Sequence, residues 1–278
     1  MLKFLHPNNI FLALDKIDSE APSYTLDKKA ALRRVFWTLA CVAVCLLLIH
    51  YLKFYSSMIA FLNQLSIWQG EHPHYWKNQF QQSGWLLLAS YVWWTFWHVV
   101  GYVILPYLVI KLVLKEKFLD MGWKLNDTRQ HWKGYLMLVT PIFFFIFLVS
   151  FRDDFLNHYP FYKLTHRSWF DFIAWEVLYL TQFICLEFFF RGFFINSLRP
   201  AIGANAVWVM CVPYLMIHFP KLWPEATGAI LFGLFLGILA LQSRSIWGGF
   251  CVHAGIAVGM DIASMLRQNK WPTVFWPF

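Results

Sequence analysis

Long apolar runs recur along this chain from Phe36 to Leu266, separated by short polar segments. A helix needs roughly 20 mostly apolar residues to cross the hydrocarbon core of a bilayer. Seven runs are candidates: Phe36–Tyr55, Trp85–Leu114, Tyr135–Phe151, Trp169–Ile195, Ala204–His218, Ala226–Gln242 and Ile246–Leu266. The pattern therefore predicts an all-α protein, a polytopic integral membrane helix bundle with about seven transmembrane helices.

The candidate spans differ in length and composition. The second is long enough to tilt strongly or to kink at Pro106, since proline removes a helical hydrogen bond. The fifth is short and carries Pro213, and we expect it to span only with help from neighbouring helices. Residues 1–35 are polar and mixed, without the pattern of a removable signal peptide. We expect a polar cytoplasmic leader at 1–35 and one membrane domain at 36–278.

Composition also indicates that lipid is the main solvent. Of the 278 residues, 59% are hydrophobic and only 14% are charged, whereas a soluble domain usually carries about 25% charged residues. Many of the 16 Trp and 29 Phe fall at the ends of apolar runs, as interfacial belts do. The five cysteines lie inside apolar runs and form no C-x-x-C pair, so they indicate neither a disulfide framework nor a zinc knuckle.

Basic residues predict the orientation of the chain. Lys and Arg gather before the first span and around the loop after the second, which places the amino terminus in the cytoplasm. These residues are Lys28, Lys29, Arg33, Arg34, Lys111, Lys115, Lys117, Lys124, Arg129 and Lys133. The net charge of +8 follows from this topology and from anionic lipid headgroups. No soluble region is large enough to hold RNA or DNA, so we expect membrane lipids as partners, no nucleic acid, and a bacterial inner membrane as the location.

Ionisable residues inside the spans are the main functional candidates, because charge is costly in lipid. In the fourth run, "WFDFIAWEVLYLTQFICLEFFFRGFFI", Glu176 and Glu187 are three helical turns apart, and Arg191 follows one turn later. Glu187 and Arg191 either form an i,i+4 ion pair with a structural role or take part in chemistry. For Glu176, nearer the start of the run, a hydrogen bond or partial hydration is the simpler interpretation.

The stretch "YLMIHFPKLWPEATGAI" carries His218 and Glu225. His218 ends an apolar helix, and Pro220 and Pro224 forbid a simple continuation. Glu225 therefore lies on a short bend that turns it toward His218, or at the entrance to the next helix, where the helix dipole favours an acid.

The last run, "SIWGGFCVHAGIAVGMDIASML", adds His253 and Asp261 among small residues that allow close helix packing. Either residue alone suits a structural polar contact. Buried Glu or His on three separate spans is less costly if these residues share one cavity. We therefore predict that Glu187, Arg191, His218 and His253 meet in a common polar cavity.

Three short motifs together resemble one family. "LEFFFRG" at Leu186–Gly192 resembles the EExxxR motif of the CAAX-protease and bacteriocin-processing family of intramembrane proteases, which includes the type II CAAX prenyl endopeptidases. "YLMIH" at Tyr214–His218 is similar to the FxxxH motif of that family, and "HAGIA" at His253–Ala257 lies where it has HxxxN or HxxxD. Order and spacing fit over roughly 169–261, about a third of the chain.

The resemblance implies a membrane-embedded glutamic-type endopeptidase that acts on a membrane-associated peptide or protein. In such enzymes a Glu activates water while His residues assist, which implies roles for Glu187, Arg191, His218 and His253. Two positions depart from the family: Leu186 replaces the Glu usually assigned as the base, and Ala257 replaces the Asn or Asp. We therefore expect an active variant in which Glu187 or Glu225 is the base and Asp261 is the late polar partner.

Peptide hydrolysis in lipid needs a water, a base and donors for the oxyanion, and none of these requires a cofactor. We expect none. The alternative is one zinc held by His218 and His253 with a Glu, which is possible on ligand count although the chain has no HExxH pair.

Two other function classes stay open. Leu186 and Ala257 suit a catalytically inactive scaffold or immunity protein that keeps the fold to bind a membrane partner. An ion- or proton-coupled transporter would use Glu176, Glu187 and Asp261 as a relay, but the chain lacks the repeat symmetry common among transporters.

Overall fold

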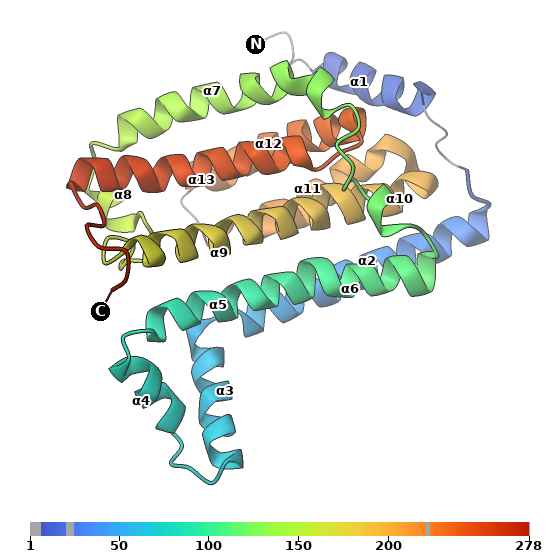
Figure 1. Ribbon diagram of the computed structural model, residues 1–278. Coiled ribbons are helices and arrows are strands. Elements are labelled where there is room, and N and C mark those ends of the chain that lie inside the picture. The colour runs from blue at the N-terminus through green and yellow to red at the C-terminus, as the bar shows by residue number, and fades with distance from the viewer. Residues whose placement is uncertain (1–6, 21–24, 221–222, 278) are drawn as a thin grey trace. The chain divides into compact units, whose positions relative to one another are not determined.

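The computed structural model describes residues 7–20, 25–220 and 223–277, and every regular element within these ranges is a helix. The helices of the first half are α1 (Pro7–Glu20), α2 (Lys28–Leu52), α3 (Tyr55–Trp68), α4 (Tyr75–Gln82), α5 (Leu86–Val99), η1 (Val100–Ile104), α6 (Leu105–Leu108), η2 (Val109–Leu114), η3 (Phe118–Asp120) and η4 (Thr128–His131). Those of the second half are α7 (Trp132–Val149), α8 (Asp153–His158), α9 (Trp169–Glu187), η5 (Phe188–Phe194), α10 (Ile195–Ile202), η6 (Gly203–Asn205), α11 (Ala206–Met216), α12 (Trp223–Ser243) and α13 (Trp247–Gln268) (Figure 1). The predicted all-α membrane fold is confirmed.

Six helical segments among the described residues are long and apolar enough to cross a membrane. They are Lys28–Leu52, Leu86–Leu114, Thr128–Val149, Trp169–Met216, Ala226–Ser243 and Trp247–Gln268. The fourth of these contains the fourth run of the sequence and residues 204–216 of the fifth. The fifth run folds as α11, whose 11 residues are too few to span a bilayer alone. The chain is therefore a multi-pass integral membrane protein.

Pro106 does not interrupt the second span. It lies in the first turn of the short α6, where its missing N–H is tolerated, between the π-helical segments η1 and η2. The helix consequently runs on from Leu86 to Leu114, with its hydrogen bonding loosened on both sides of the proline.

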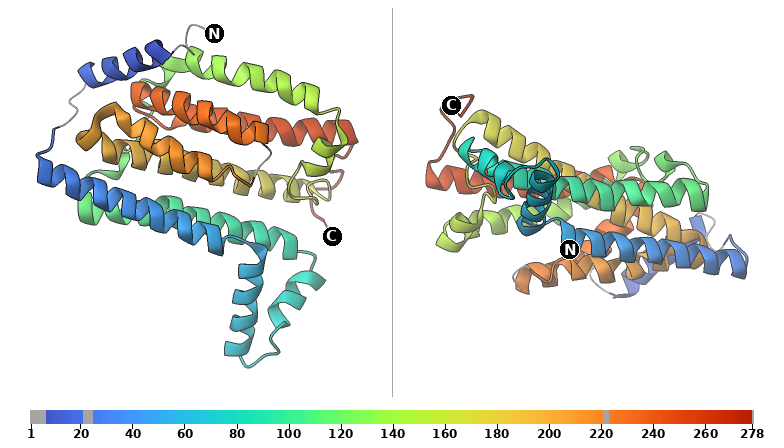
Figure 2. Two further views of the ribbon diagram at one scale, coloured as in Figure 1. Left: turned by 180° about the vertical axis from the view of Figure 1, so that it is seen from behind. Right: turned by 90° about the horizontal axis from the view of Figure 1, so that it is seen from below.

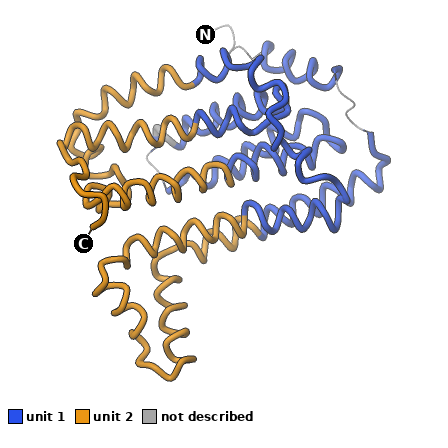
Figure 3. The backbone as a smooth tube through the Cα atoms, in the orientation of Figure 1, with its two compact units in different colours: residues 1–44, 102–138, 186–252 blue, residues 45–101, 139–185, 253–278 orange. Residues whose placement is uncertain are grey.

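The chain divides into two compact units, each built from three stretches of sequence (Figure 3). Unit 1 comprises residues 1–44, 102–138 and 186–252, and unit 2 comprises 45–101, 139–185 and 253–278. Five of the long helical segments contribute residues to both units.

In unit 1, α11 and α12 lie side by side because two glycines of α12 remove side chains from their interface. Added Cβ atoms would lie 2.9 Å from the ring of Tyr214 at Gly233 and 2.8 Å from Val207 at Gly237. This "GLFLG" spacing is a small-xxx-small motif, which lets helices in membranes approach closely. Helix α1 contacts α12 and η6.

Unit 1 is also held by Arg34 of α2. Its guanidinium forms two hydrogen bonds with the Glu116 carboxylate, at 2.8 and 2.9 Å, and its Nε donates to the carbonyl oxygen of Ser197. Asp18 of α1 accepts from the backbone N–H of Ala204. These contacts attach α1 and α2 to the segment after η2, to α10 and to η6.

In unit 2, α3 and α4 form a helical hairpin that contacts α5, as the views from two sides show (Figure 2). An aromatic core lies around Trp175 and Tyr179 of α9, whose rings stack 4.8 Å apart, with Tyr162 and Leu88 packed against them. This core fixes α9 in unit 2.

The start of α9 is fixed by Asp171, which is fully buried. Its carboxylate accepts hydrogen bonds from Arg167, Ser168 and Tyr162 at 2.6 to 2.8 Å. Burial, and then the neighbouring carboxylate, raise the pKa of Tyr162, so this hydroxyl stays a neutral donor. The first two N–H groups of α9 bond to the carboxy-terminal tail, since Trp169 donates to the carbonyl oxygen of Val274 and Phe170 to that of Phe275.

Candidate active site

Glu187 and Arg191 form a completely buried ion pair in unit 1. Glu187 ends α9 with 0% of its surface exposed, and Arg191 lies in the π-helical segment η5 with 1% exposed. The Arg191 Nη1 is 3.0 Å from the Glu187 Oε1. The predicted i,i+4 pairing is confirmed, and the π-helical turn that carries the arginine is a feature common at functional sites.

Five phenylalanines of the same π-helical segment are also buried, namely Phe188, Phe189, Phe190, Phe193 and Phe194. Hydrocarbon around an ion pair strengthens its attraction but makes each charge costly to leave alone. Removal of either charge should therefore affect the fold as well as any chemistry.

The backbone at the start of α13 packs against the Glu187 carboxylate. A side chain at Gly249 would overlap the Glu187 Oε2, and one at Gly248 would overlap the ring of Tyr135. The Tyr135 hydroxyl lies 3.0 Å from the Ser243 Oγ. Two adjacent glycines thus let α13 approach both side chains.

Tyr214 connects Arg191 to His218. The Arg191 guanidinium carbon lies 4.0 Å from the centre of the Tyr214 ring, within cation–π range. The ring of His218 is 4.8 Å from the same tyrosine ring, and its Nδ1 is 2.8 Å from the Tyr214 carbonyl oxygen. Because a carbonyl oxygen only accepts, Nδ1 carries the hydrogen, and in the neutral form of the ring Nε2 is then the acceptor.

The structure therefore brings together three of the four residues predicted to share a cavity, since Glu187, Arg191 and His218 are linked through Tyr214 in unit 1. Glu225, the alternative base, lies in the first turn of α12 rather than on a bend before it, and its side chain falls outside the described part of the structure.

His253 and Asp261 of α13 belong to unit 2. The His253 ring stacks on Phe183 with centres 5.5 Å apart and planes 11° apart. Asp261 is fully buried, and its Oδ2 accepts a hydrogen bond of 2.6 Å from the Trp175 Nε1. Ala257, between them in sequence, lies in the apolar core of unit 2. The predicted roles of His253 and Asp261 beside Glu187 stay predictions.

No group of three or more His, Cys, Asp and Glu side chains among the described residues is placed to hold a metal ion. The zinc alternative and the expected absence of a cofactor both stay predictions.

Sequence reasoning did not single out Tyr214, Gly249 or Trp175. Tyr214 stands at the first position of the FxxxH-like motif, so its place in the sequence could have indicated a role beside His218. Gly249 and Trp175 act through contacts with Glu187 and Asp261, which are 62 and 86 residues away, and no local pattern predicts them.

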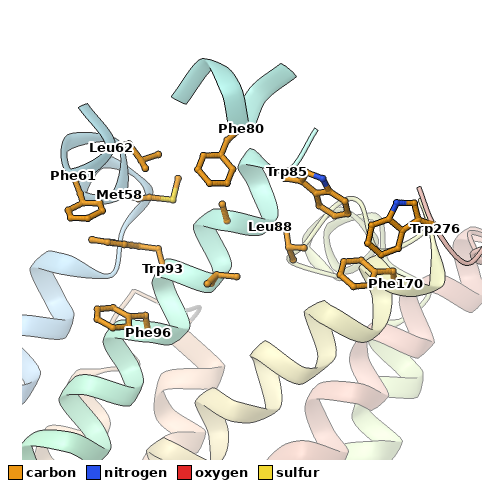
Figure 4. A pocket seen from close by; sticks show the side chains of 12 residues that line it. Met58, Phe61, Leu62, Phe80, Trp85, Leu88, Trp93, Phe96, Phe170 and Trp276 are labelled. Carbon is orange, nitrogen blue, oxygen red and sulfur yellow. The ribbon is translucent and has the colours of Figure 1, made fainter. Parts of the chain in front are cut away.

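Unit 2 also contains an apolar pocket of about 660 Å³ (Figure 4). Its walls come from α3, α4, α5, the start of α9 and the carboxy-terminal tail. The lining residues are Met58, Phe61, Leu62, Phe80, Trp85, Leu88, Ala89, Val92, Trp93, Phe96, Phe170 and Trp276. Such a lining suits hydrocarbon and offers little to a polar ligand.

Comparison with known proteins found a family match over part of the chain. Residues 167–259 match the family described as type II CAAX prenyl endopeptidase Rce1-like. No curated protein and no solved structure matches the chain. The match confirms the resemblance seen in the three motifs and includes Glu187, Arg191, His218 and His253. Fold and match together define the class: a multi-pass, all-α membrane protein with a segment similar to membrane endopeptidases of the CAAX-protease type.

Proposed function

We propose that this protein is an intramembrane glutamic-type endopeptidase that cleaves a membrane-associated peptide or protein, with Glu187 as the water-activating base. The observation that carries the proposal is the buried Glu187–Arg191 pair, linked through Tyr214 to His218 in the segment that matches the prenyl endopeptidase family. A carboxylate in apolar surroundings is a stronger base than one in water.

In the proposed reaction, Glu187 accepts a proton from a water molecule while the water oxygen attacks the scissile carbonyl carbon. The Glu187 carboxyl then passes this proton to the leaving nitrogen as the C–N bond breaks. Arg191 keeps Glu187 ionised before the attack, and its positive charge stabilises the developing oxyanion. In this reaction the Nε2 of His218 accepts a hydrogen bond from the water and orients it.

The HAGIA motif at His253–Ala257 supports a role for His253 as a donor to the oxyanion. Glu225 remains the alternative base, and Asp261 the late polar partner that replaces the missing Asn or Asp. The reaction as written uses no metal. We further propose that the protein resides in a bacterial inner membrane with a cytoplasmic amino terminus, and that its substrate carries a lipid or another membrane anchor.

A catalytically inactive scaffold is the second candidate, and one observation favours it. Leu186 and Ala257, which replace polar residues of the family motifs, are both buried core residues with 5% and 0% of their surface exposed. Apolar packing at these two positions is what a protein that keeps the fold without the reaction would show.

Cleavage by the purified chain in lipid vesicles tests the proposal. A fluorogenic peptide ending in a prenylated CAAX sequence serves as substrate, and the same peptide without the lipid serves as control. We expect wild type to cleave, and Glu187→Gln to lose about 10²-fold or more of the rate, as removal of a general base does. Glu225→Gln, His253→Ala and Asp261→Asn test the other assignments one at a time, and a chelator arm tests zinc.

If Glu187→Gln retains activity and Glu225→Gln loses it, the base is Glu225. Full activity in all four variants would overturn the assignment of these residues to the reaction. No turnover of any peptide by wild type, with a membrane partner retained through all the substitutions, would favour the scaffold.

A further inference from the structure

Unit 2 contains two buried carboxyl groups, on α9 and α13, that the proposed reaction does not bring together. Glu176 is 9% exposed, and neither of its carboxyl oxygens has a hydrogen-bond partner among the described residues. Asp261 is fully buried, and its Oδ1 likewise has no hydrogen-bond partner in the described part of the chain. Trp175, next to Glu176 in sequence, donates to the Asp261 Oδ2 at 2.6 Å, so the Asp261 carboxyl lies against the part of α9 that carries Glu176.

No cation of the described chain neutralises this pair. The positive charge of Lys163, in the loop before α9, acts on Asp261, but its Nζ donates to the carbonyl oxygens of Asn157 and His158. From α5, Tyr91 interacts with Asp261, but its hydroxyl donates to the carbonyl oxygen of Phe161. No ion pair to Glu176 or Asp261 occurs among the described residues.

Two carboxyl groups that are buried without a neutralising cation are not stable when both are ionised. Transfer of an isolated carboxylate into an apolar interior costs far more than a hydrogen bond returns, and a second negative charge nearby adds to the cost. Asp171, on the same helix and with none of its surface exposed, shows the contrast, because Arg167, Ser168 and Tyr162 satisfy it with hydrogen bonds and positive charge. Glu176 has no such partners among the described residues. A bound proton is the simplest way to neutralise the negative charge of Glu176 and Asp261.

We propose that Glu176 and Asp261 form a proton-binding site inside unit 2, in which the two carboxyl groups hold at least one proton at neutral pH. The Trp175 indole N–H donates to Asp261 and so stabilises the ionised form of this carboxyl group. The proton is therefore held by Glu176. The site joins α9 to α13. This inference goes beyond the proposed function and does not depend on it.

Dicyclohexylcarbodiimide, an apolar reagent that modifies protonated carboxyl groups in membranes, tests this site in the full chain in detergent or vesicles. We expect modification of Glu176 at neutral pH, located by peptide mass spectrometry, while Asp171 stays unmodified as an internal control. In Asp261→Asn the neighbouring negative charge is gone, so the pH at which modification of Glu176 falls to half should move to lower values. A purely structural Asp261 would leave that midpoint unchanged.

Infrared spectroscopy detects a protonated carboxyl group directly and does not require the reagent to reach the site. The carbonyl stretch of a protonated carboxylic acid should be present in wild type at neutral pH and lost in the Glu176→Gln, Asp261→Asn double variant. Absence of that band from wild type would overturn the proposal. Protection of Glu176 by sodium or potassium at constant pH, but not by choline, would also overturn it, since the ligand would then be a metal cation.

Discussion

The Glu187 carboxylate lies directly against the backbone of Gly249, so closely that a methyl group at Gly249 would overlap its Oε2. The carboxylate of the proposed base is thus positioned from two sides, by the Arg191 guanidinium on its own helical segment and by the first turn of α13. The absence of a side chain at Gly249 is therefore part of the site.

Gly249→Ala should lower both activity and stability. In a helix interior, alanine is ordinarily more stable than glycine by roughly 0.5–1 kcal/mol, so helix propensity alone predicts the opposite sign. Gly228→Ala is the matched control, because an added Cβ there meets nothing within 4 Å in α12. We expect thermal unfolding in detergent to occur at lower temperature for Gly249→Ala and at equal or higher temperature for Gly228→Ala. Equal behaviour of the two variants would contradict the contact with Glu187.

The buried ion pair should show strong coupling between its two members. Arg191→Gln leaves the Glu187 carboxylate buried without its cation, and loss of one partner of a buried pair costs about 3–5 kcal/mol. The Glu187→Gln, Arg191→Gln double variant removes both charges and should unfold closer to wild type than Arg191→Gln does. A double-mutant cycle by chemical unfolding measures this difference. Additive costs would show that the two charges do not stabilise each other.

Two amide substitutions at His218 should distinguish its structural hydrogen bond from its role in peptide cleavage. Its Nδ1 donates to the Tyr214 carbonyl oxygen, and the amide nitrogen of asparagine can occupy nearly the same position. His218→Asn should therefore unfold near the wild-type temperature but lose peptide cleavage, since nothing replaces Nε2. His218→Gln extends its amide past the Nδ1 position and should lose both. Cleavage retained by His218→Asn would restrict His218 to a structural role.

Much of the fold could be predicted from the sequence because helices in lipid must be long and apolar, and such runs are visible without tertiary information. The run from 204 to 218 is the exception, since it folds as the 11-residue α11, whose packing on α12 depends on glycines further along the chain. The Glu187–Arg191 pair was predictable because it depends only on helical spacing. The contacts of Asp261 with Trp175 and of Glu187 with Gly249 were not, because they join residues far apart in sequence. The π-helical turn η5 has no sequence signal that we recognise among its phenylalanines.

The start of α9 provides a comparison between a buried and an exposed ion pair. Arg167 holds the fully buried Asp171 through two hydrogen bonds, also donates to the carbonyl oxygen of Gly84, and packs over the Trp85 ring. Arg152 forms a similar two-point contact with Asp154, but both of these side chains are more than half exposed. Arg167→Gln should therefore destabilise the protein by about 3 kcal/mol, as removal of the cation from a buried carboxylate does.

Arg152→Gln is the matched change in an exposed pair and should leave the unfolding temperature unchanged within error, because water replaces the lost contact. Asp171→Asn combined with Arg167→Gln should recover part of the loss, since the buried negative charge is then gone as well. Thermal unfolding of the four proteins in one detergent measures all three expectations. If Arg167→Gln and Arg152→Gln unfold at the same temperature, the buried carboxylate at the start of α9 does not stabilise this helix.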